Sequence, residues 1–209
     1  MNLTIEGYAE QARRWPTNGE HILAQFDDAS VVVYQAYRPS TGSHAIEHGR
    51  LGGPDFSFER MSWIKPNFLW MMYRSGWGTK PGQEVILGLR IRRTFFEDIL
   101  DRAVASSYDP SRHPTHEHWK AEVQGSDVRL QWDPDHAPDG SKLGRRAIQL
   151  GLRGDALKAL AGPELLEVID VSGFVAQQRP HALADWSSLL MPKEQVYPRS
   201  SHSQTAVVR

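Results

Sequence analysis

The residues best suited to chemistry gather in one part of the chain, residues 60–93. Aromatic faces can stack on a planar group such as a base or a nicotinamide, while ammonium and guanidinium groups hold phosphate oxygens. The segment combines both kinds of side chain: Trp63, Lys65, Trp70, Tyr73, Arg74, Trp77 and Lys80. It therefore favours a site for a nucleotide or a nucleic-acid phosphate.

A second interpretation of the same segment stays open. Aromatic and Met residues at helical spacing are usually core, and cations beside them often form a solvated rim whose stems lie along apolar surface. Glycines next to Trp77, Lys80 and Gln83 favour the ligand, because backbone without Cβ atoms can approach a bound group closely. The loop does not match the phosphate-binding pattern GxxxxGK[ST].

Isolated glutamines interrupt three apolar segments that read as strands. Gln35 lies between Tyr34 and Tyr37, and Gln131 and Gln149 occupy two later segments. A buried amide needs partners, since an unpaired one costs about 1–3 kcal/mol. Its partner is either neighbouring backbone or the polar edge of a ligand, and both remain open. The candidate ligand-binding residues are Tyr34, Gln35, Tyr37, Trp63, Lys65, Tyr73, Arg74, Trp77, Lys80, Gln83, Gln131, Arg146 and Gln149.

We expect no metal site. The chain has no cysteine, which excludes thiolate ligands and thiolate catalysis. His113, His116 and His118 lie close in sequence, but two prolines interrupt any element that would aim them together. The acidic run at 133–140 lacks the glycine and the third oxygen ligand of a calcium loop. No pair of carboxylates or Ser/His/Asp arrangement identifies a catalytic residue.

Composition sets the class of protein. With 209 residues, 40% apolar residues and a formal net charge of −1, the chain suits one globular domain and not a general nucleic-acid coat. No positively charged start followed by an apolar run marks a secretory signal, and no apolar stretch is long enough to span a membrane. A soluble, cytoplasmic protein is expected.

The elements that must position these residues alternate irregularly between strands and helices. Runs of β-branched and alternating apolar residues predict strands at 30–37, 84–92, 128–132, 146–153 and 165–171. Helical spacing and start or stop signals predict helices at 4–15, 66–75, 94–106 and 155–161. This mixed order predicts an α+β domain with a mostly antiparallel mixed sheet of about five to six strands, covering residues 1–180. Residues 181–209 are expected to form a polar, loosely held tail.

Four motifs carry a resemblance to a known family: VVVYQAY at 31–37, RMSWIKPNFLWMMYRSGWGTKPGQE at 60–84, VRLQWDP at 128–134 and RAIQLGLRG at 146–154. Together they resemble the domain of unknown function 4291 family over about residues 8–178. The resemblance implies no established activity. His136 departs from it, because an arginine is expected after the WDP motif.

The order of elements is also similar, at the level of fold, to ADP-ribosyltransferases, which bind NAD in a split sheet. This similarity implies NAD as a candidate cofactor, although no glutamate in the chain has the context of their catalytic residue. The competing function is a protein-interaction module or a homodimer that buries the aromatic patch around Trp77, because Tyr, Trp, Met and Arg are enriched at interfaces.

Overall fold

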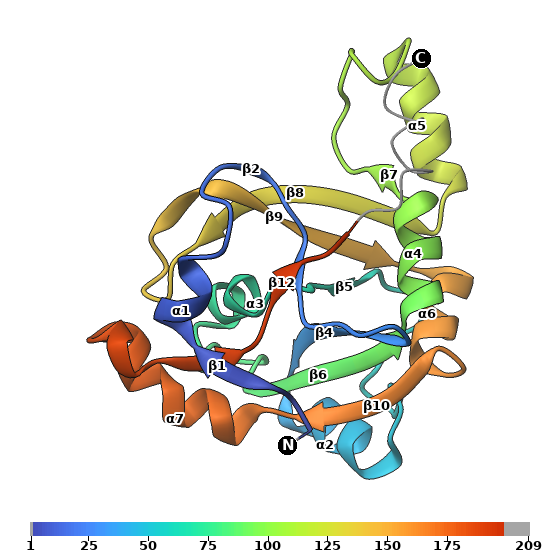
Figure 1. The fold of residues 1–209 in the computed structure, drawn as a ribbon. Helices are drawn as coiled ribbons and strands as arrows, with labels where there is room; N and C mark the ends of the chain where they lie inside the picture. The colour runs from blue at the N-terminus through green and yellow to red at the C-terminus, as the bar shows by residue number, and fades with distance from the viewer. Residues whose placement is uncertain (1, 199–209) are drawn as a thin grey trace.

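The computed structural model describes residues 2–198, which form intermingled helices and strands (Figure 1). The first half of the chain contains β1 (Ile5–Gly7), α1 (Tyr8–Ala12), β2 (Gly19–Glu20), β3 (Leu23–Ala24), β4 (Ser30–Tyr37), α2 (Pro39–His48), β5 (Ser62–Ile64), α3 (Phe68–Ser75), β6 (Val85–Arg92) and α4 (Arg93–Asp101). The second half contains β7 (Val104–Ala105), α5 (His116–Gly125), β8 (Val128–His136), β9 (Lys142–Leu152), α6 (Gly154–Ala161), β10 (Leu165–Asp170), α7 (Ser172–Leu183), a 3₁₀ turn (Trp186–Ser188), β11 (Leu190–Pro192) and β12 (Gln195–Val196).

Two principal sheets form the body of the protein. The first is antiparallel, with the order β10-β6-β4. In the second, β9 pairs with β8, β5 and the short β2, while β7 extends the edge beyond β8. Only β2 with β9 and β7 with β8 are parallel among the described pairs. The α+β class with mostly antiparallel pairing is therefore confirmed.

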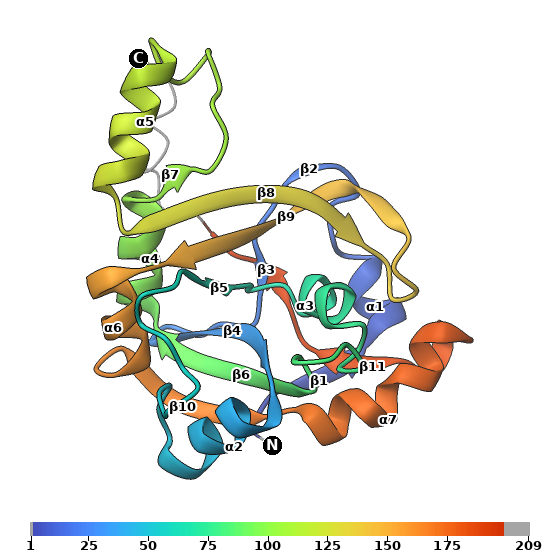
Figure 2. The same ribbon diagram turned by 180° about the vertical axis from the view of Figure 1, so that it is seen from behind.

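A single backbone bridge joins the two sheets. The amide of Tyr34 donates to the carbonyl of Lys65 at 2.7 Å, and the amide of Lys65 donates back at 3.2 Å. Figure 2 shows the result, with β8 and β9 arching over β4 and β6. Because Lys65 follows β5 directly, this bridge places its side chain at the junction of the sheets.

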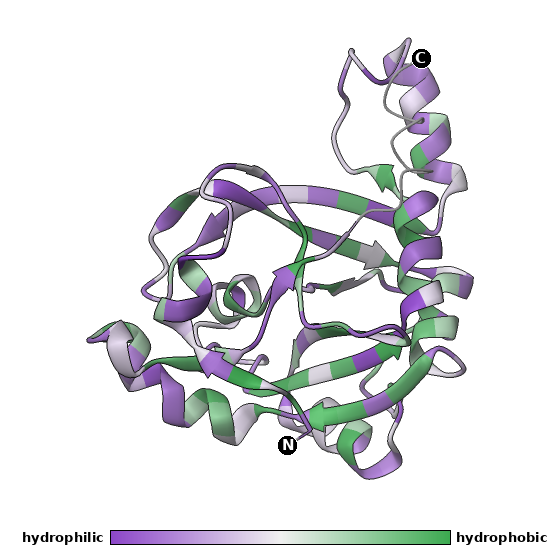
Figure 3. Ribbon diagram, viewed as in Figure 1, coloured by the Kyte–Doolittle hydropathy of each residue, from purple (hydrophilic) through white to green (hydrophobic). Residues whose placement is uncertain are grey.

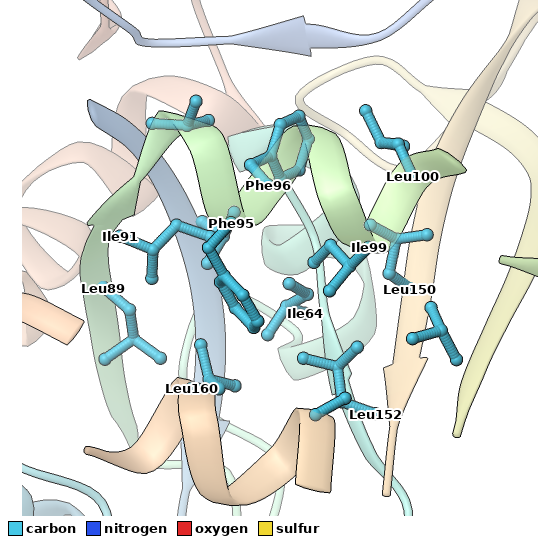
Figure 4. Packing of buried hydrophobic residues seen from close by; sticks show 14 of the residues in the cluster. Ile64, Leu89, Ile91, Phe95, Phe96, Ile99, Leu100, Leu150, Leu152 and Leu160 are labelled. Carbon is cyan, nitrogen blue, oxygen red and sulfur yellow. The ribbon is translucent and has the colours of Figure 1, made fainter. Parts of the chain in front are cut away.

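One hydrophobic core lies between the inner faces of the two sheets and under α4 and α6. Figure 4 shows Phe95 and Ile99 of α4 pointing toward strand residues such as Ile64, Leu89 and Leu150. The strand side chains Ile64, Leu89 and Leu150 are buried together because alternate residues of each strand face the same side. The strand residues between them point to the opposite face of each sheet.

A second core lies on the opposite face of β4 and β6, where α3 and α7 cover it. Val32 and Tyr34 of β4 meet Phe68 and Met72 of α3 there, together with Val175 of α7. The strand β4 is thus buried on both faces, as its run of valines predicts.

The helix α3 ends at Ser75, where its sequence signals predict, and begins at Phe68, two residues after the predicted start. The Asn67 side chain accepts the amide of Trp70 at 2.6 Å as an N-cap, and Gly76 follows the helix with φ 59°. The buried carboxylate of Glu194 accepts the amide of Phe68 at 2.6 Å. An otherwise unpartnered N–H of the first turn is thereby satisfied from the far end of the chain.

Two helices occur where irregular chain is expected. The helix α5 lies within the histidine-rich stretch and projects from the body as an arm (Figures 1 and 2). Figure 3 shows the physical reason, since α5 is largely hydrophilic and lacks the apolar stripe that marks a packed helix. The helix α7 includes Pro180 and has no strong apolar face either.

The start of the expected loose tail packs against the body. Residues 181–198 contain the end of α7 and the strands β11 and β12, which pair with β1 and β3. Leu189, Met191 and Tyr197 are buried. These apolar residues stand singly among polar ones, so the sequence shows no periodic pattern. They are buried because β11 and β12 pair with β1 and β3 near the N-terminus. The remainder of the expected tail, from 199 onward, lies outside the described residues.

Candidate functional site

The hairpin of β8 and β9 carries a polar face beside α3. Gln131 of β8 lies opposite Gln149 of β9, and Asp133 lies opposite Ala147. Their neighbours Leu130, Ile148 and Leu150 turn toward the core between the sheets. Since side chains alternate along a strand, the two glutamines and Asp133 share the other face.

Both glutamines hold the same carboxylate. Gln131 Nε2 donates to Asp133 Oδ1 at 2.7 Å, and Gln149 Nε2 donates to Asp133 Oδ2 at 2.8 Å. Each amide therefore directs its carbonyl oxygen away from Asp133. The Ser106 hydroxyl donates weakly to the Gln131 carbonyl at 3.4 Å, while no donor among residues 2–198 reaches the Gln149 carbonyl. A ligand with an N–H edge could bond there.

Lys65 lies next to this carboxylate at the junction of the sheets. Only 5% of Lys65 is exposed, and no acceptor within the described chain lies within hydrogen-bonding distance of its ammonium group. The pKa of Lys65 is lowered to about 8, chiefly by burial and also by the nearby charge of Arg74, while Asp133 opposes both effects. The site therefore holds a nearly buried cation without a bonded counter-ion.

Arg74 adds a second cation from the last turn of α3. Its guanidinium is exposed and forms no ion pair within residues 2–198. Lys80, predicted to accompany it, points elsewhere, because its ammonium donates to the carbonyls of Tyr73 and Arg74 at 3.3 and 2.7 Å. Lys80 thus satisfies free carbonyls at the end of α3.

The aromatic residues of the segment divide into buried and accessible rings. Trp70 and Trp77 are 5% and 7% exposed, and the Trp77 indole donates to the Pro138 carbonyl at 3.0 Å. Tyr73 is 39% exposed, but His136 stacks on it with ring centroids 3.5 Å apart. Trp63 is half-buried above Gly151 on the face that carries the glutamines. Trp63 and the outer edge of Tyr73 are the rings that a ligand could reach.

Gln35 and Tyr37 lie on the face of β4 opposite to the face that carries Tyr34. The Gln35 amide donates to the Ser62 hydroxyl at 2.7 Å and to the Trp63 carbonyl at 3.2 Å. The Tyr37 hydroxyl donates to the Gln35 carbonyl at 2.6 Å, and burial raises the pKa of Tyr37. Neighbouring groups therefore satisfy the whole Gln35 amide.

The other predicted residues lie apart from the polar face or are engaged by the protein. Tyr34 is fully buried, and its hydroxyl has no partner in the described part of the chain. Arg146 is exposed and donates to the Trp132 carbonyl at 2.6 Å. Gln83 lies in the loop after α3, where its backbone amide bonds to the Lys80 carbonyl.

Of the thirteen predicted residues, Lys65, Gln131 and Gln149 lie near one residue that the sequence does not single out, and Arg74 lies near Lys65. The missed residue is Asp133. The prediction ended the strand at Asp133 and Pro134, whereas β8 continues to His136. A spacing of two residues between Gln131 and Asp133 was the available signal, since it places both on one strand face.

A surface pocket of about 520 Å³ lies elsewhere, between the N-terminal residues and β6. None of the predicted residues lines it. Its cation, Arg90, is engaged by Glu167 at 2.9 Å and by the Asn2 carbonyl at 2.6 Å. The pocket therefore offers no free positive charge to an anion. No helix among residues 2–198 has the length and apolar character needed to cross a bilayer.

The comparisons with known proteins agree with the motif resemblance. A family model described as Domain of unknown function (DUF4291) matches residues 21–197. No curated protein matches the chain. Because the family match covers well over half of the chain and includes β8, β9 and α3, this protein belongs to the DUF4291 family.

Proposed function

We propose that the polar face of β8 and β9 binds a phosphate-bearing nucleotide. Lys65 and Arg74 would contact phosphate oxygens, and the carbonyl of Gln149 would accept an N–H from the base or from a nicotinamide amide. Trp63 is the ring placed to stack. The observation that carries the proposal is the nearly buried, unbonded ammonium of Lys65 beside the exposed guanidinium of Arg74.

A bound phosphate would compensate the positive charges of Lys65 and Arg74. A buried ammonium that meets no anion keeps its desolvation penalty, and a second cation nearby adds repulsion. Asp133 offsets part of this charge, but two glutamine amides already occupy its oxygens. A phosphate group with charge near −2 would neutralise both cations and give each a charge-assisted hydrogen bond. The site is therefore built to gain stability from an anion.

Binding to the wild-type chain tests the proposal directly. Calorimetric titration with NAD, ATP and a short RNA is expected to show saturable binding of at least one of them. Lys65→Met and Arg74→Met should each weaken it about 10-fold or more, because each removes a charge-assisted contact of about 1.5–3 kcal/mol. Lys158→Met is the matched control, since Lys158 is exposed and pairs with Asp155. No binding at about 1 mM of any ligand would refute the proposal.

Incubation with NAD allows a second measurement, the release of nicotinamide. If the bound nucleotide undergoes ADP-ribosyl transfer, the bond between nicotinamide and ribose breaks, and free nicotinamide accumulates when the ribosyl carbon bonds to an acceptor. Chromatography of NAD incubated with the chain measures this release. NAD binding without release would assign a binding function and would exclude transfer to water or to the protein itself.

Self-association is the competing function, and a sedimentation measurement separates it. Trp77 is buried, so a dimer using this region would have to rely on exposed neighbours such as Tyr73 and Arg74. A stable dimer that dissociates in Tyr73→Ala, together with absence of nucleotide binding, would favour an interaction module.

A further inference from the structure

The arm formed by residues 107–126 is held to the body at its base, where the Arg153 guanidinium donates to the carbonyls of Val123, Gln124 and Ser126. The helix α5 has ten residues, and none of them is buried. Isolated helices of this length are marginal in water. One attachment is the Trp119 indole, which donates to the Ala105 carbonyl of β7 at 2.9 Å. The Tyr108 ring contacts His116 and Trp119, which joins the preceding loop to α5.

Three potential ligands converge where this loop meets the helix. His118 and Glu122 are four residues apart on α5 and so share one helix face. His113 reaches them from the loop and is 11% exposed at its side chain. The distance from His113 Nδ1 to Glu122 Oε2 is 2.9 Å, and that from His118 Nδ1 to Glu122 Oε1 is 3.5 Å. The ligand atoms of all three residues lie within 4.8 Å of one another.

We propose that His113, His118 and Glu122 bind a Zn²⁺ ion that fastens the loop to α5. Imidazole nitrogen and carboxylate oxygen are ordinary zinc ligands, at about 2.0–2.2 Å. Tetrahedral geometry at those lengths separates neighbouring ligand atoms by about 3.3 Å. The two imidazoles lie at comparable distances, 2.9 and 3.5 Å, from different oxygens of Glu122. A water molecule would complete the coordination.

The position of the cluster indicates a structural role for the ion. All three ligands come from one ten-residue stretch, residues 113–122, and the site lies on the arm away from the polar face of β8 and β9. The N-cap of α5, Thr115, lies within this stretch and accepts the His118 amide at 3.1 Å. Closing the stretch with a metal would therefore hold the first turn of α5 in its capped form.

Zinc titration of the metal-free full chain tests the site. Calorimetry near neutral pH is expected to show one Zn²⁺ per chain. His118→Ala and Glu122→Gln should each weaken the affinity by at least about 10-fold, since even residues that only orient zinc ligands contribute that much. The matched control is His116→Ala, because His116 lies on the same helix and contacts Tyr108 and Trp119 rather than Glu122.

Hydrogen exchange adds a readout that does not depend on affinity. Zinc should slow amide exchange across residues 113–122 in the wild type and in His116→Ala, but not in His118→Ala. Absence of stoichiometric binding, or equal losses in His116→Ala and His118→Ala, would overturn the proposal. In that case Glu122 only bonds to two imidazoles. Neither measurement involves a nucleotide, so the result is independent of the proposed function.

Discussion

The ammonium of Lys65 is costly for folding. It is nearly removed from water and has no hydrogen-bond acceptor in the described chain. The pKa of Lys65 falls from 10.5 to about 8 because burial disfavours the charged form. A shift of that size corresponds to a penalty on the order of 3 kcal/mol at neutral pH.

Replacing Lys65 by Met should therefore stabilise the protein. Met has a similar length and carries no charge, so Lys65→Met is expected to raise the free energy of unfolding at neutral pH by up to about 3 kcal/mol. The folded-state pKa is depressed, so the unfolded chain binds the extra proton between about pH 8 and 10.5. Wild-type stability should rise across this window, and the difference between the two proteins should shrink.

Urea denaturation at several pH values measures both effects. Lys158→Met, at an exposed position, serves as the control and should leave the pH dependence unchanged. A large destabilisation by Lys65→Met that persists across the window would show that the ammonium has a partner after all.

Asp133 should act on Lys65 through its charge. The carboxylate raises the pKa of Lys65 and accepts two amide hydrogen bonds. Asp133→Asn is expected to lower the pKa of Lys65 further, and to cost about 1–3 kcal/mol of stability by leaving a donor unpaired. An NMR titration of the Lys65 side chain reports the pKa directly. Asp155→Asn, at an exposed carboxylate, should leave it unchanged; an unchanged pKa in Asp133→Asn would show that the two charges do not interact.

At the scale of elements, close packing depends on where glycine is present. In α2, a Cβ built on Gly42 would lie 2.4 Å from Val85 Cγ1 and 2.5 Å from Val85 Cβ of β6. In α7, a Cβ on Gly173 would meet nothing within 4 Å. Both glycines are helical, so the same substitution tests two different environments.

The two alanine variants should change stability in opposite directions. Gly42→Ala is expected to cost about 1–3 kcal/mol, because α2 must move away from β6. Gly173→Ala is expected to add about 0.5–1 kcal/mol through helix propensity alone. Thermal unfolding of both variants gives the comparison, and an equal gain in both would mean that α2 does not pack closely on Val85.

For the whole molecule, Glu194, which lies between β11 and β12, connects elements that are distant in sequence. The Glu194 amide donates to the Gln11 side chain at 2.7 Å, and the Trp15 indole donates to the Glu194 carbonyl at 3.0 Å. Its side-chain carboxylate accepts the Phe68 amide. Residues from α1, α3 and the C-terminal segment therefore meet at Glu194. Burial raises the pKa of this carboxyl well above its usual range, although the Phe68 amide opposes the shift.

Glu194 should make stability depend on pH in the opposite sense to ordinary paired carboxylates. Its folded-state pKa is raised, so above the unfolded pKa of about 4.3 the unfolded chain ionises first, and stability falls as pH rises. Glu194→Gln keeps the acceptor for Phe68 and should flatten this fall. Glu194→Leu should cost about 1–3 kcal/mol more than Glu194→Gln, because it leaves the Phe68 amide unpaired.

Denaturation of these variants between mildly acidic and mildly alkaline pH measures the dependence. Glu47→Gln, at an exposed position on α2, is the control and should follow the wild type. A wild-type stability that does not fall with rising pH would contradict a raised pKa of Glu194 in the folded protein.

The sequence by itself determined the fold class, the two-sided burial of β4, the C-terminal end of α3 and the family, because local alternation, a capping glycine and long motifs specify them. It also identified Lys65, Arg74, Gln131 and Gln149 as unusual residues. Only the tertiary structure decided that Lys65, Gln131 and Gln149 lie near Asp133, that Gln35 and Lys80 are satisfied by neighbouring groups, and that the chain packs through residue 198. These outcomes depend on strand pairing between distant segments, which no local pattern encodes.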